Sequence, residues 1–368
     1  MAKVKIIGAG SSGNNLASAC RQLAWDVTVC DVEEEALTRM RKDIYPNRYG
    51  RWDDAIKLST LDKAPKGGFE FICVCLEPEK HLSMAMEALE EKPQGIVIDR
   101  PVCPPHMELA HELMEAGKER GVRLFAAYEL TVARGAELIG DMITGHHLGE
   151  IVTLEVEYRE HWESVLKAQP WVLGPHVSHL GWWEQGGGAG GEHSQALNLW
   201  QHLAHLSGKG RVVEVDAMVS YAREGKAVWD SLACWNLRTE KGFTGRVVQD
   251  VISKPSRKRA RLQGSEGAVE LSVNHTPDSD ALFVVRPGAP EKITPVHKKK
   301  TDDFIAAMRH VWSVTKDGKE SAISLERGLD TALLVAAAHQ SEQEKCRVRI
   351  DWSVGYTPEA IVPCRRPE

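Results

Sequence analysis

The chain has 368 residues, a formal net charge of −6 and 27% charged residues. Single hydrophobic cores rarely grow beyond about 250–300 residues, so this length favours two domains. The mild negative charge argues against a nucleic acid or an anionic membrane as partner, and no apolar run reaches the roughly 18 residues of a membrane span.

The first 127 residues alternate short apolar runs with amphipathic segments. The run FEFICVCL at 69–76 is continuously apolar, which is typical of a strand buried on both faces of a parallel sheet. The alternation predicts a doubly wound parallel α/β domain over residues 1–127. The expected strands cover 4–7, 27–30, 69–76, 96–98 and 122–127, and the expected helices cover 14–23, 33–42, 79–91 and 104–120.

The remainder of the chain has a different pattern. Residues 151–158 (IVTLEVEY) alternate strictly between apolar and polar, as in a strand with one buried and one solvent-exposed face. Residues 128–368 are therefore predicted to form an α+β domain with a mostly antiparallel open sheet and one helical layer. Further strands are expected at 212–221, 227–237, 244–252, 268–273, 281–285 and 348–352, and helices at 194–206, 302–315 and 324–339.

A glycine motif at the N-terminus predicts a dinucleotide site. Residues 8–13 read GAGSSG, a GxGxxG that directly follows an apolar strand and opens a helix. Gly8 permits the tight turn, Gly10 lets the backbone approach a diphosphate, and Gly13 lets the helix pack on the strand. The backbone N–H groups of Ser11 and Ser12 then lie at a helix N-terminus, which favours an anion.

The residue that ends the second strand determines the expected cofactor. A carboxylate at Asp31 accepts hydrogen bonds from the ribose hydroxyls of the adenosine and repels a 2′-phosphate. Residues 32–35 read VEEE, so no Lys or Arg adjoins Asp31 to pair with a phosphate. We therefore expect NAD rather than NADP.

Further motifs resemble one oxidoreductase family over nearly the whole length. They are GAGSSG at 8–13, DRP at 99–101, GVRLFAAYEL at 121–130, LGEI at 148–151, the glycines at 186–188 and ARLQGSEGAVEL at 260–271. In these motifs the chain resembles the Gfo/Idh/MocA oxidoreductases, which include glucose–fructose oxidoreductase and inositol dehydrogenase. The resemblance implies a Rossmann domain followed by a sheet domain that binds sugars, cyclitols or related polyols. It also implies a homodimer or homotetramer packed through that sheet.

The chain departs from this family where a lysine is usual. The family motif is Glu-Lys-Pro, and its Lys helps to position or protonate the reacting hydroxyl. Here Arg100 stands before Pro101, and an arginine does not release its proton. We expect Arg100, beside Pro101, to orient the substrate or to support the nicotinamide ribose.

A second departure concerns the helix after the glycines. The family usually has an Asp and a His four residues apart, with the His as general base and a further acid three residues on. One register places Gly191, Gln195 and Asn198 at these positions, and another places Glu192 and Ala196 at the first two. No His stands at the position of the base in either register.

Nearby side chains are the candidates for the missing chemistry. His193 is the best candidate base because its ordinary pKa is near 6.5, although it is also placed as a hydrogen-bonded histidine at the buried edge of the helix. Glu192 caps the helix or contacts substrate, and Gln195 and Asn198 are expected to hydrogen-bond substrate hydroxyls. Tyr128, at the carboxyl edge of the first sheet, is a candidate donor.

The middle of the chain is rich in His and Trp. His176 and His179 lie in the loop LGPHVSHLG and are candidate substrate contacts. Trp162, like the tryptophans that follow it, either stacks on a sugar ring or packs in the core. His202 and His205 share a helical face but have no acidic or Cys partner at ligand spacing, so no metal site is predicted.

Together these features predict hydride transfer between NAD and a secondary alcohol of a sugar, sugar derivative or cyclitol. Two alternatives stay open: an NAD-using lyase or glycosidase with transient oxidation and no net redox change, or a non-catalytic NAD-binding protein. The eight cysteines form no CxxC pair, and the N-terminus runs straight into a strand without a signal peptide. We therefore expect a cytoplasmic protein.

Overall fold

The structure is a computed structural model that describes residues 2–364. Its contacts divide the chain into two compact units, which are described separately. The N-terminal unit comprises the segment ending at Cys103, Leu109–Glu129 and Thr301–Gly328, and the C-terminal unit comprises Pro104–Glu108, Leu130–Lys300 and the segment from Leu329. The predicted division between residues 127 and 128 lies close to one of these boundaries. The return of residues 301–328 to the N-terminal unit was not expected from the sequence.

The N-terminal unit contains a six-stranded parallel sheet in the order β3-β2-β1-β4-β5-β6. The order reverses direction beside β1, so β1 and β4 flank the point where a doubly wound sheet binds its ligand. This confirms the predicted fold class of the first half. The strands are β1 (Lys3–Ile7), β2 (Asp26–Asp31), β3 (Lys57–Thr60), β4 (Phe71–Val74), β5 (Gly95–Ile98) and β6 (Arg123–Ala126).

The helices of this unit differ from the predicted ones in two places. The helix expected at 33–42 continues to Tyr49 through a π-helical turn, η1. The helix expected at 104–120 begins only at Ala110, because Leu109 has a left-handed φ of 65° that cannot continue a helix. The helices are α1 (Ser11–Gln22), α2 (Glu34–Arg39), η1 (Met40–Ile44), α3 (Tyr45–Tyr49), α4 (Pro78–Leu89), α5 (Ala110–Glu119) and α10 (Asp302–Asp317).

Residues 301–328, which return to the N-terminal unit, pack on elements from the start of the chain. Helix α10 lies against α1, and its Trp312 ring contacts Trp25 and Phe71 at centroid distances of 5.6 and 6.0 Å. Ala126 also donates its backbone N–H to the carbonyl of Ile323. Residues 301–328 therefore complete the N-terminal core.

The C-terminal unit is built on a ten-stranded sheet in the order β14-β13-β12-β11-β7-β10-β9-β8-β15-β16. All pairs are antiparallel except β7 with β10, which confirms the predicted mostly antiparallel sheet. The strands are β7 (Ile151–Arg159), β8 (Val212–Glu224), β9 (Ala227–Thr239), β10 (Thr244–Asp250), β11 (Arg257–Gly264), β12 (Gly267–Thr276), β13 (Ser279–Val285), β14 (Lys292–His297), β15 (Val348–Ile350) and β16 (Ile361–Pro363).

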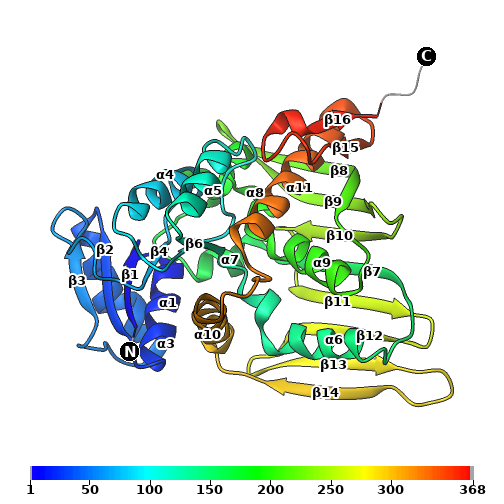
Figure 1. Cartoon of the computed structure of the whole chain (residues 1–368), viewed down its shortest axis with the longest axis horizontal. Helices are drawn as coiled ribbons and strands as arrows, with labels where there is room; N and C mark the ends of the chain where they lie inside the picture. Colours follow the sequence, from blue (N-terminus) through cyan, green and yellow to red (C-terminus); the bar gives the residue numbers. More distant parts are fainter. Residues whose placement is uncertain (1, 365–368) are drawn as a thin grey trace. The chain divides into compact units, whose positions relative to one another are not determined.

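Helices cover one face of this sheet (Figure 1). Trp200 on α9 donates its indole N–H to the carbonyl of Leu154 at 3.0 Å, and Trp235 on β9 donates to the carbonyl of Leu334 on α11 at 3.2 Å. Alternate strand residues point to the opposite, open face. The helices are α6 (Arg134–Thr144), α7 (Trp162–Lys167), α8 (Gly188–Glu192), α9 (Gln195–Leu206) and α11 (Leu325–Glu344), with short 3-10 turns at η2 (Glu129–Val132), η3 (Pro175–Val177), η4 (His179–Gly181), η5 (Trp183–Gln185) and η6 (Pro358–Ala360).

No helix between residues 2 and 364 is both long enough and apolar enough to cross a lipid bilayer.

Candidate functional site

The glycine motif forms a tight turn between β1 and α1. Gly8 has a φ of +112°, and a Cβ there would lie 2.1 Å from the carbonyl oxygen of Cys75, which follows β4. A Cβ on Gly13 would lie 1.9 Å from the carbonyl oxygen of Gly8. Only glycine fits at these two positions, because the turn folds back on itself and on the segment after β4.

Gly10 has a different reason to be a glycine. A Cβ placed on it would meet no atom within 4 Å, so packing within the protein does not demand a glycine there. Gly10 is also the N-cap of α1 and has no side chain to occupy the first backbone N–H groups, and the first turn holds no acidic residue. The open space and the free N–H groups suit an anion such as a diphosphate.

Asp31 is fixed beside this turn. One carboxylate oxygen accepts the backbone N–H of Ala9 at 2.8 Å, and the other accepts that of Glu33 at 3.0 Å. The carboxylate therefore spans from the glycine turn to the start of α2, with lone pairs left for ribose hydroxyls. Val32 and the three glutamates that follow it are all exposed, so a 2′-phosphate would meet negative charge here.

Arg100 and Pro101 follow β5 at the carboxyl edge of the same sheet. The backbone N–H of Arg100 bonds to the carboxylate of Asp99, and the Arg100–Pro101 peptide is cis. The Arg100 guanidinium lies 3.7 Å from a carboxylate oxygen of Glu129, whose side chain is buried. The sequence did not predict this ion pair. It orients the guanidinium of Arg100, the residue that stands where the Glu-Lys-Pro motif has its lysine.

Two further groups line this edge of the sheet. Tyr128 follows β6, and its side chain is buried, with 1% exposed. His81 on α4 is fully buried, and its ring nitrogens each lie 2.9 Å from a carbonyl oxygen, one of Leu76 and one of Pro101. His81 therefore connects the chain after β4 to the Arg100–Pro101 segment. Its signal in the sequence was a polar residue on the apolar face of a predicted helix.

In the C-terminal unit, the helix expected at 194–206 is preceded by a short separate helix. Helix α8 ends at Glu192, His193 follows it, and α9 begins at Gln195. His193 and Gln195 are 3% and 5% exposed, and the His193 carbonyl accepts a bond from the Gln249 amide at 2.6 Å. The structure thus keeps His193 close to Gln195 but outside the regular helix, at a bend between two helices.

Asn198 lies one turn further along α9 and is held by its neighbours. Its amide oxygen accepts the hydroxyl of Thr131 at 2.6 Å, and its amide nitrogen donates to the hydroxyl of Thr331 at 3.1 Å. Gln201 also donates to Thr331, at 3.0 Å. These bonds tie α9 to the segments that flank it, so Asn198 has a clear structural role whether or not it meets a substrate.

The remaining predicted substrate contacts are dispersed. Trp162 begins α7 and is buried in a cluster with Leu180, Trp229 and Val251, which is the core-packing alternative for this residue. His176 lies 2.9 Å from a carboxylate oxygen of Glu224, and the two side chains are 37% and 56% exposed. His179 starts the turn η4. Their contact with substrate stays a prediction.

Asp230 was missed by the sequence analysis and supports the glycine run before α8. It is fully buried on β9, and its carboxylate accepts the backbone N–H of Gly190 at 2.6 Å. A Cβ on Gly188 would lie 1.8 Å from the other carboxylate oxygen, so the chain passes directly over Asp230. Burial raises the pKa of Asp230 to about 7. The one signal in the sequence is an Asp among buried residues of a predicted strand.

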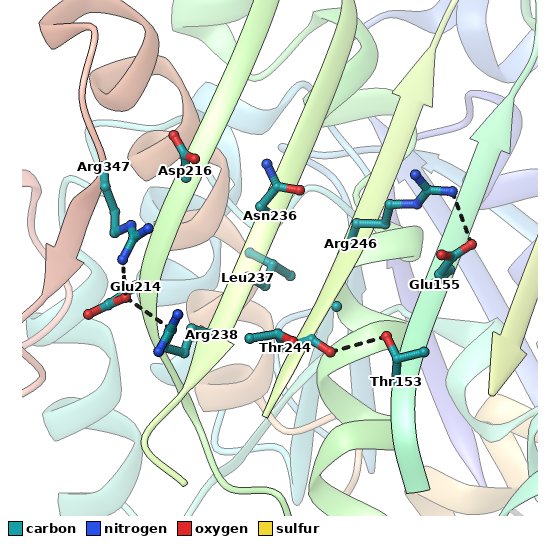
Figure 2. Close-up of a pocket in the computed structure, with 11 residues that line it drawn as sticks. Thr153, Glu155, Glu214, Asp216, Asn236, Leu237, Arg238, Thr244, Arg246 and Arg347 are labelled. Atoms are coloured by element: carbon teal, nitrogen blue, oxygen red, sulfur yellow. Dashed lines mark hydrogen bonds and ion pairs between the residues drawn. The ribbon is translucent and has the colours of Figure 1, made fainter. Parts of the chain in front are cut away.

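Within residues 2–364, no three or more His, Cys, Asp or Glu side chains are grouped as a metal site would require. A shallow polar hollow lies elsewhere, on the open face of the ten-stranded sheet (Figure 2). Its volume of about 270 Å³ is slightly below the range of about 300–1,000 Å³ typical of small-molecule sites. The hollow is lined by ion pairs such as Arg246 with Glu155 at 3.2 Å and Arg347 with Glu214 at 3.0 Å.

The sheet order and the glycine turn between β1 and α1 are those of a dinucleotide-binding Rossmann domain. A family model described as "Oxidoreductase family, NAD-binding Rossmann fold", that of Gfo/Idh/MocA, matches residues 2–128. This confirms the predicted family and the predicted cofactor. Over residues 2–128 the chain is therefore similar to the NAD-binding Rossmann domain of the Gfo/Idh/MocA oxidoreductases. A search of curated proteins found no match.

Solved structures of similar fold extend over both units. A levoglucosan dehydrogenase in complex with NADH and L-sorbose is 16% identical, with a TM-score of 0.76, over 95% of this chain and 98% of that chain. The WlbA dehydrogenase from Bordetella pertussis, in complex with NADH and UDP-GlcNAcA, is 19% identical with a TM-score of 0.71 over 95% and 98%. An oxidoreductase from Agrobacterium radiobacter with NAD+, L-tartaric acid and magnesium is 16% identical with a TM-score of 0.72 over the same shares. At these identities the likeness is one of fold.

Proposed function

We propose that the chain catalyses reversible hydride transfer between NAD and a secondary alcohol of a sugar, sugar derivative or cyclitol. The observation that carries the proposal is the NAD-binding turn with Arg100, paired to Glu129, at the carboxyl edge of the same sheet. The sugar-related ligands of the similarly folded levoglucosan and WlbA dehydrogenases support this substrate class.

The N-terminal unit would hold the cofactor with groups already in place. The first turn of α1, with Gly10, Ser11 and Ser12, would hold the diphosphate, and Asp31 would bind the adenosine ribose. When bound, NAD supplies a hydride acceptor at its nicotinamide.

Arg100 remains charged throughout, so its part is to orient a hydroxyl or ribose oxygen rather than to move a proton. Glu129 holds its guanidinium in one direction, and the neighbouring Pro101 carbonyl is fixed by His81. Tyr128 would donate a hydrogen bond from the same edge.

The C-terminal unit would supply the proton acceptor and the substrate contacts. His193 is the proposed general base, since an imidazole can take the hydroxyl proton as hydride leaves the carbon. Gln195 and Asn198 would contact adjacent hydroxyls. Glu192, His176, His179 and Trp162 are proposed as further contacts, and the burial of Trp162 favours packing over stacking for that residue.

The test is a panel of sugars, sugar acids and cyclitols incubated with NAD, with NADH formation recorded by absorbance. We expect at least one to reduce NAD, and His193→Ala to lower kcat by about 10²-fold or more. The exposed His205→Ala, on the same stretch of chain, is the matched control. Full turnover by His193→Ala would remove His193 as the base.

Two results of this panel would replace the proposal. Turnover of a glycoside without net NADH would indicate an elimination or hydrolysis that uses transient oxidation. Tight NAD binding with no turnover of any compound would indicate a non-catalytic protein. Both outcomes are included because Arg100 and Gln195 stand where the family has its Lys and its His.

We also propose that a second copy of this chain packs on the open face of the ten-stranded sheet. This face carries both charge signs in alternation, as in the Arg238–Glu214 pair at 3.3 Å, and a surface of mixed sign can be complementary to itself about a twofold axis. Met218 on the same sheet is 73% exposed. A Met218→Glu variant should shift a dimer to monomer in sedimentation, and a monomeric parent chain would overturn the proposal.

The eight cysteines, which all lie within the described residues, are free thiols. Thiols persist in reducing compartments, so we propose a cytoplasmic location. Fluorescence microscopy of a tagged full chain tests it.

A further inference from the structure

An arginine from another helix reaches the first turn of α1. Arg48 lies on α3, and its guanidinium donates to the Ser11 carbonyl at 2.8 Å, to the Ser11 hydroxyl at 2.7 Å and to the Asn15 side-chain oxygen at 3.1 Å. Tyr49 donates to the same Asn15 oxygen at 2.7 Å. Ser11 belongs to the glycine motif, so this cation stands at the proposed diphosphate site.

The sequence motif gives no hint of Arg48. The GxGxxG pattern places ligand groups on β1, the turn and α1 only, and Arg48 is 35 residues beyond Gly13. The arginine arrives through the continuous run of α2, η1 and α3, in which η1 is a π-helical turn. Such turns occur often at functional sites, because the wider turn redirects the residues that follow it.

The Arg48 guanidinium adds positive charge at the start of α1. The N-terminus of a helix carries partial positive charge, and a cation there is repelled. The first turn of α1 has no acidic residue to offset this charge. The side chain is also partly buried, and burial lowers the pKa of Arg48. A fixed cation beside a positive helix end is the arrangement that an anionic ligand would stabilise.

We propose that Arg48 binds the diphosphate of the dinucleotide together with the first turn of α1, as a phosphate ligand outside the glycine motif. The inference rests on the NAD site described above. A guanidinium donates up to five N–H bonds in a planar fork, and its bonds to phosphate are charge-assisted. Its bond to the Ser11 hydroxyl also leaves the hydroxyl hydrogen free to turn toward the ligand.

The alternative role for Arg48 is a purely structural clamp between α1 and α3. The two roles differ in what they change. A clamp affects the melting temperature and every ligand equally, whereas a phosphate ligand affects only ligands that carry phosphate and makes their binding depend on salt.

The experiment compares the Arg48→Gln variant with the unsubstituted parent chain. Arg41 is an exposed arginine on η1, and Arg41→Gln is the matched control. The affinities for NADH, ADP and adenosine are measured by fluorescence titration and competition at several salt concentrations. For Arg48→Gln we expect about tenfold weaker NADH and ADP, unchanged adenosine and a shallower salt dependence. Arg41→Gln should match the parent chain in its affinities for NADH, ADP and adenosine and in their salt dependence.

Two results would overturn the inference. They are unchanged NADH and ADP affinity in folded Arg48→Gln, or an equal loss of affinity for adenosine and ADP. If Arg48→Gln does not fold, Arg48→Lys serves instead, because a single ammonium cannot reproduce the fork. It should weaken ADP a few-fold and spare adenosine, and any other pattern refutes the inference. Failure of the parent chain to bind NADH would refute the NAD site itself.

Discussion

Replacement of Asp230 by Asn should change how the stability of the chain depends on pH. The carboxyl is fully buried, and burial raises its pKa to about 7 from an ordinary value near 3.8. In the unfolded chain the group ionises freely, whereas in the folded chain it stays protonated until about pH 7. The parent chain is therefore most stable, with respect to this group, below about pH 4, and that stability is lost as pH rises toward 7.

The size of the effect follows from the shift. A difference of about three pKa units corresponds to about 4 kcal/mol in the free energy of unfolding, of which about 1.7 is already lost at about pH 5. The remaining loss between about pH 5 and pH 8 is about 2–3 kcal/mol. Asn cannot ionise, so Asp230→Asn should lack this loss. Its amide can still accept the Gly190 N–H through oxygen, and any constant cost of the amide nitrogen cancels in the slope.

The assay is urea denaturation of both chains at a series of pH values, with the difference in unfolding free energy plotted against pH. We expect Asp230→Asn to gain about 2–3 kcal/mol on the parent between about pH 5 and pH 8. Asp216→Asn, an exposed carboxylate on the adjacent strand β8, controls for the removal of a surface charge. Parallel curves for Asp230→Asn and the parent would refute the reasoning, because they would mean that Asp230 is ionised in the folded state.

Four further substitutions test the cofactor site and the Arg100–Glu129 pair beside it. Asp31→Ser should weaken NADH about tenfold and reduce the preference for NADH over NADPH in fluorescence titration, and an unchanged preference would exclude Asp31 as the ribose ligand. Gly13→Ala places a Cβ 1.9 Å from a carbonyl oxygen and should lower the melting temperature sharply. Gly10→Ala should preserve the melting temperature and weaken NADH binding. Equal melting temperatures for the two variants would contradict the packing argument. Glu129→Gln should lower kcat/KM about tenfold at nearly constant NADH affinity, because Arg100 loses its charged partner, and an unaffected kcat/KM would show that the pair is not needed.

Local patterns in the sequence predicted most elements of the fold. The apolar run 69–76 includes β4, because a strand buried on both faces is apolar throughout. The alternating residues 151–158 form most of β7, because a strand buried on one face alternates apolar and polar residues. Helix α6 was not predicted. Strand β14 was also not predicted, since its Pro295 and exposed residues resemble a loop although it is an edge strand.

The candidate site was predictable only where a motif fixes it. The residues 8–13 and Asp31 have a spacing that physical chemistry requires of any dinucleotide turn. The partners Glu129, Asp230 and Arg48 carry no such spacing, because each meets its target through tertiary contacts between distant segments. The side chain of Asn198 shows the converse: its place on the helix was predicted, but its bonds to Thr131 and Thr331 depend on how two other segments pack.

The return of Thr301–Gly328 to the N-terminal unit has a consequence for synthesis on the ribosome. The NAD-binding sheet is complete once Ala126 has emerged, but α10, which covers Trp25 and Phe71 through Trp312, begins at Asp302, 176 residues later. Arg123 likewise donates to the carbonyls of Val314 and Lys319. The aromatic surface of the nascent N-terminal unit therefore stays uncovered while the eight strands β7–β14 of the second sheet are translated. A fragment that ends where the Rossmann motif ends, near residue 128, should bind chaperones and aggregate rather than fold as a free NAD-binding domain.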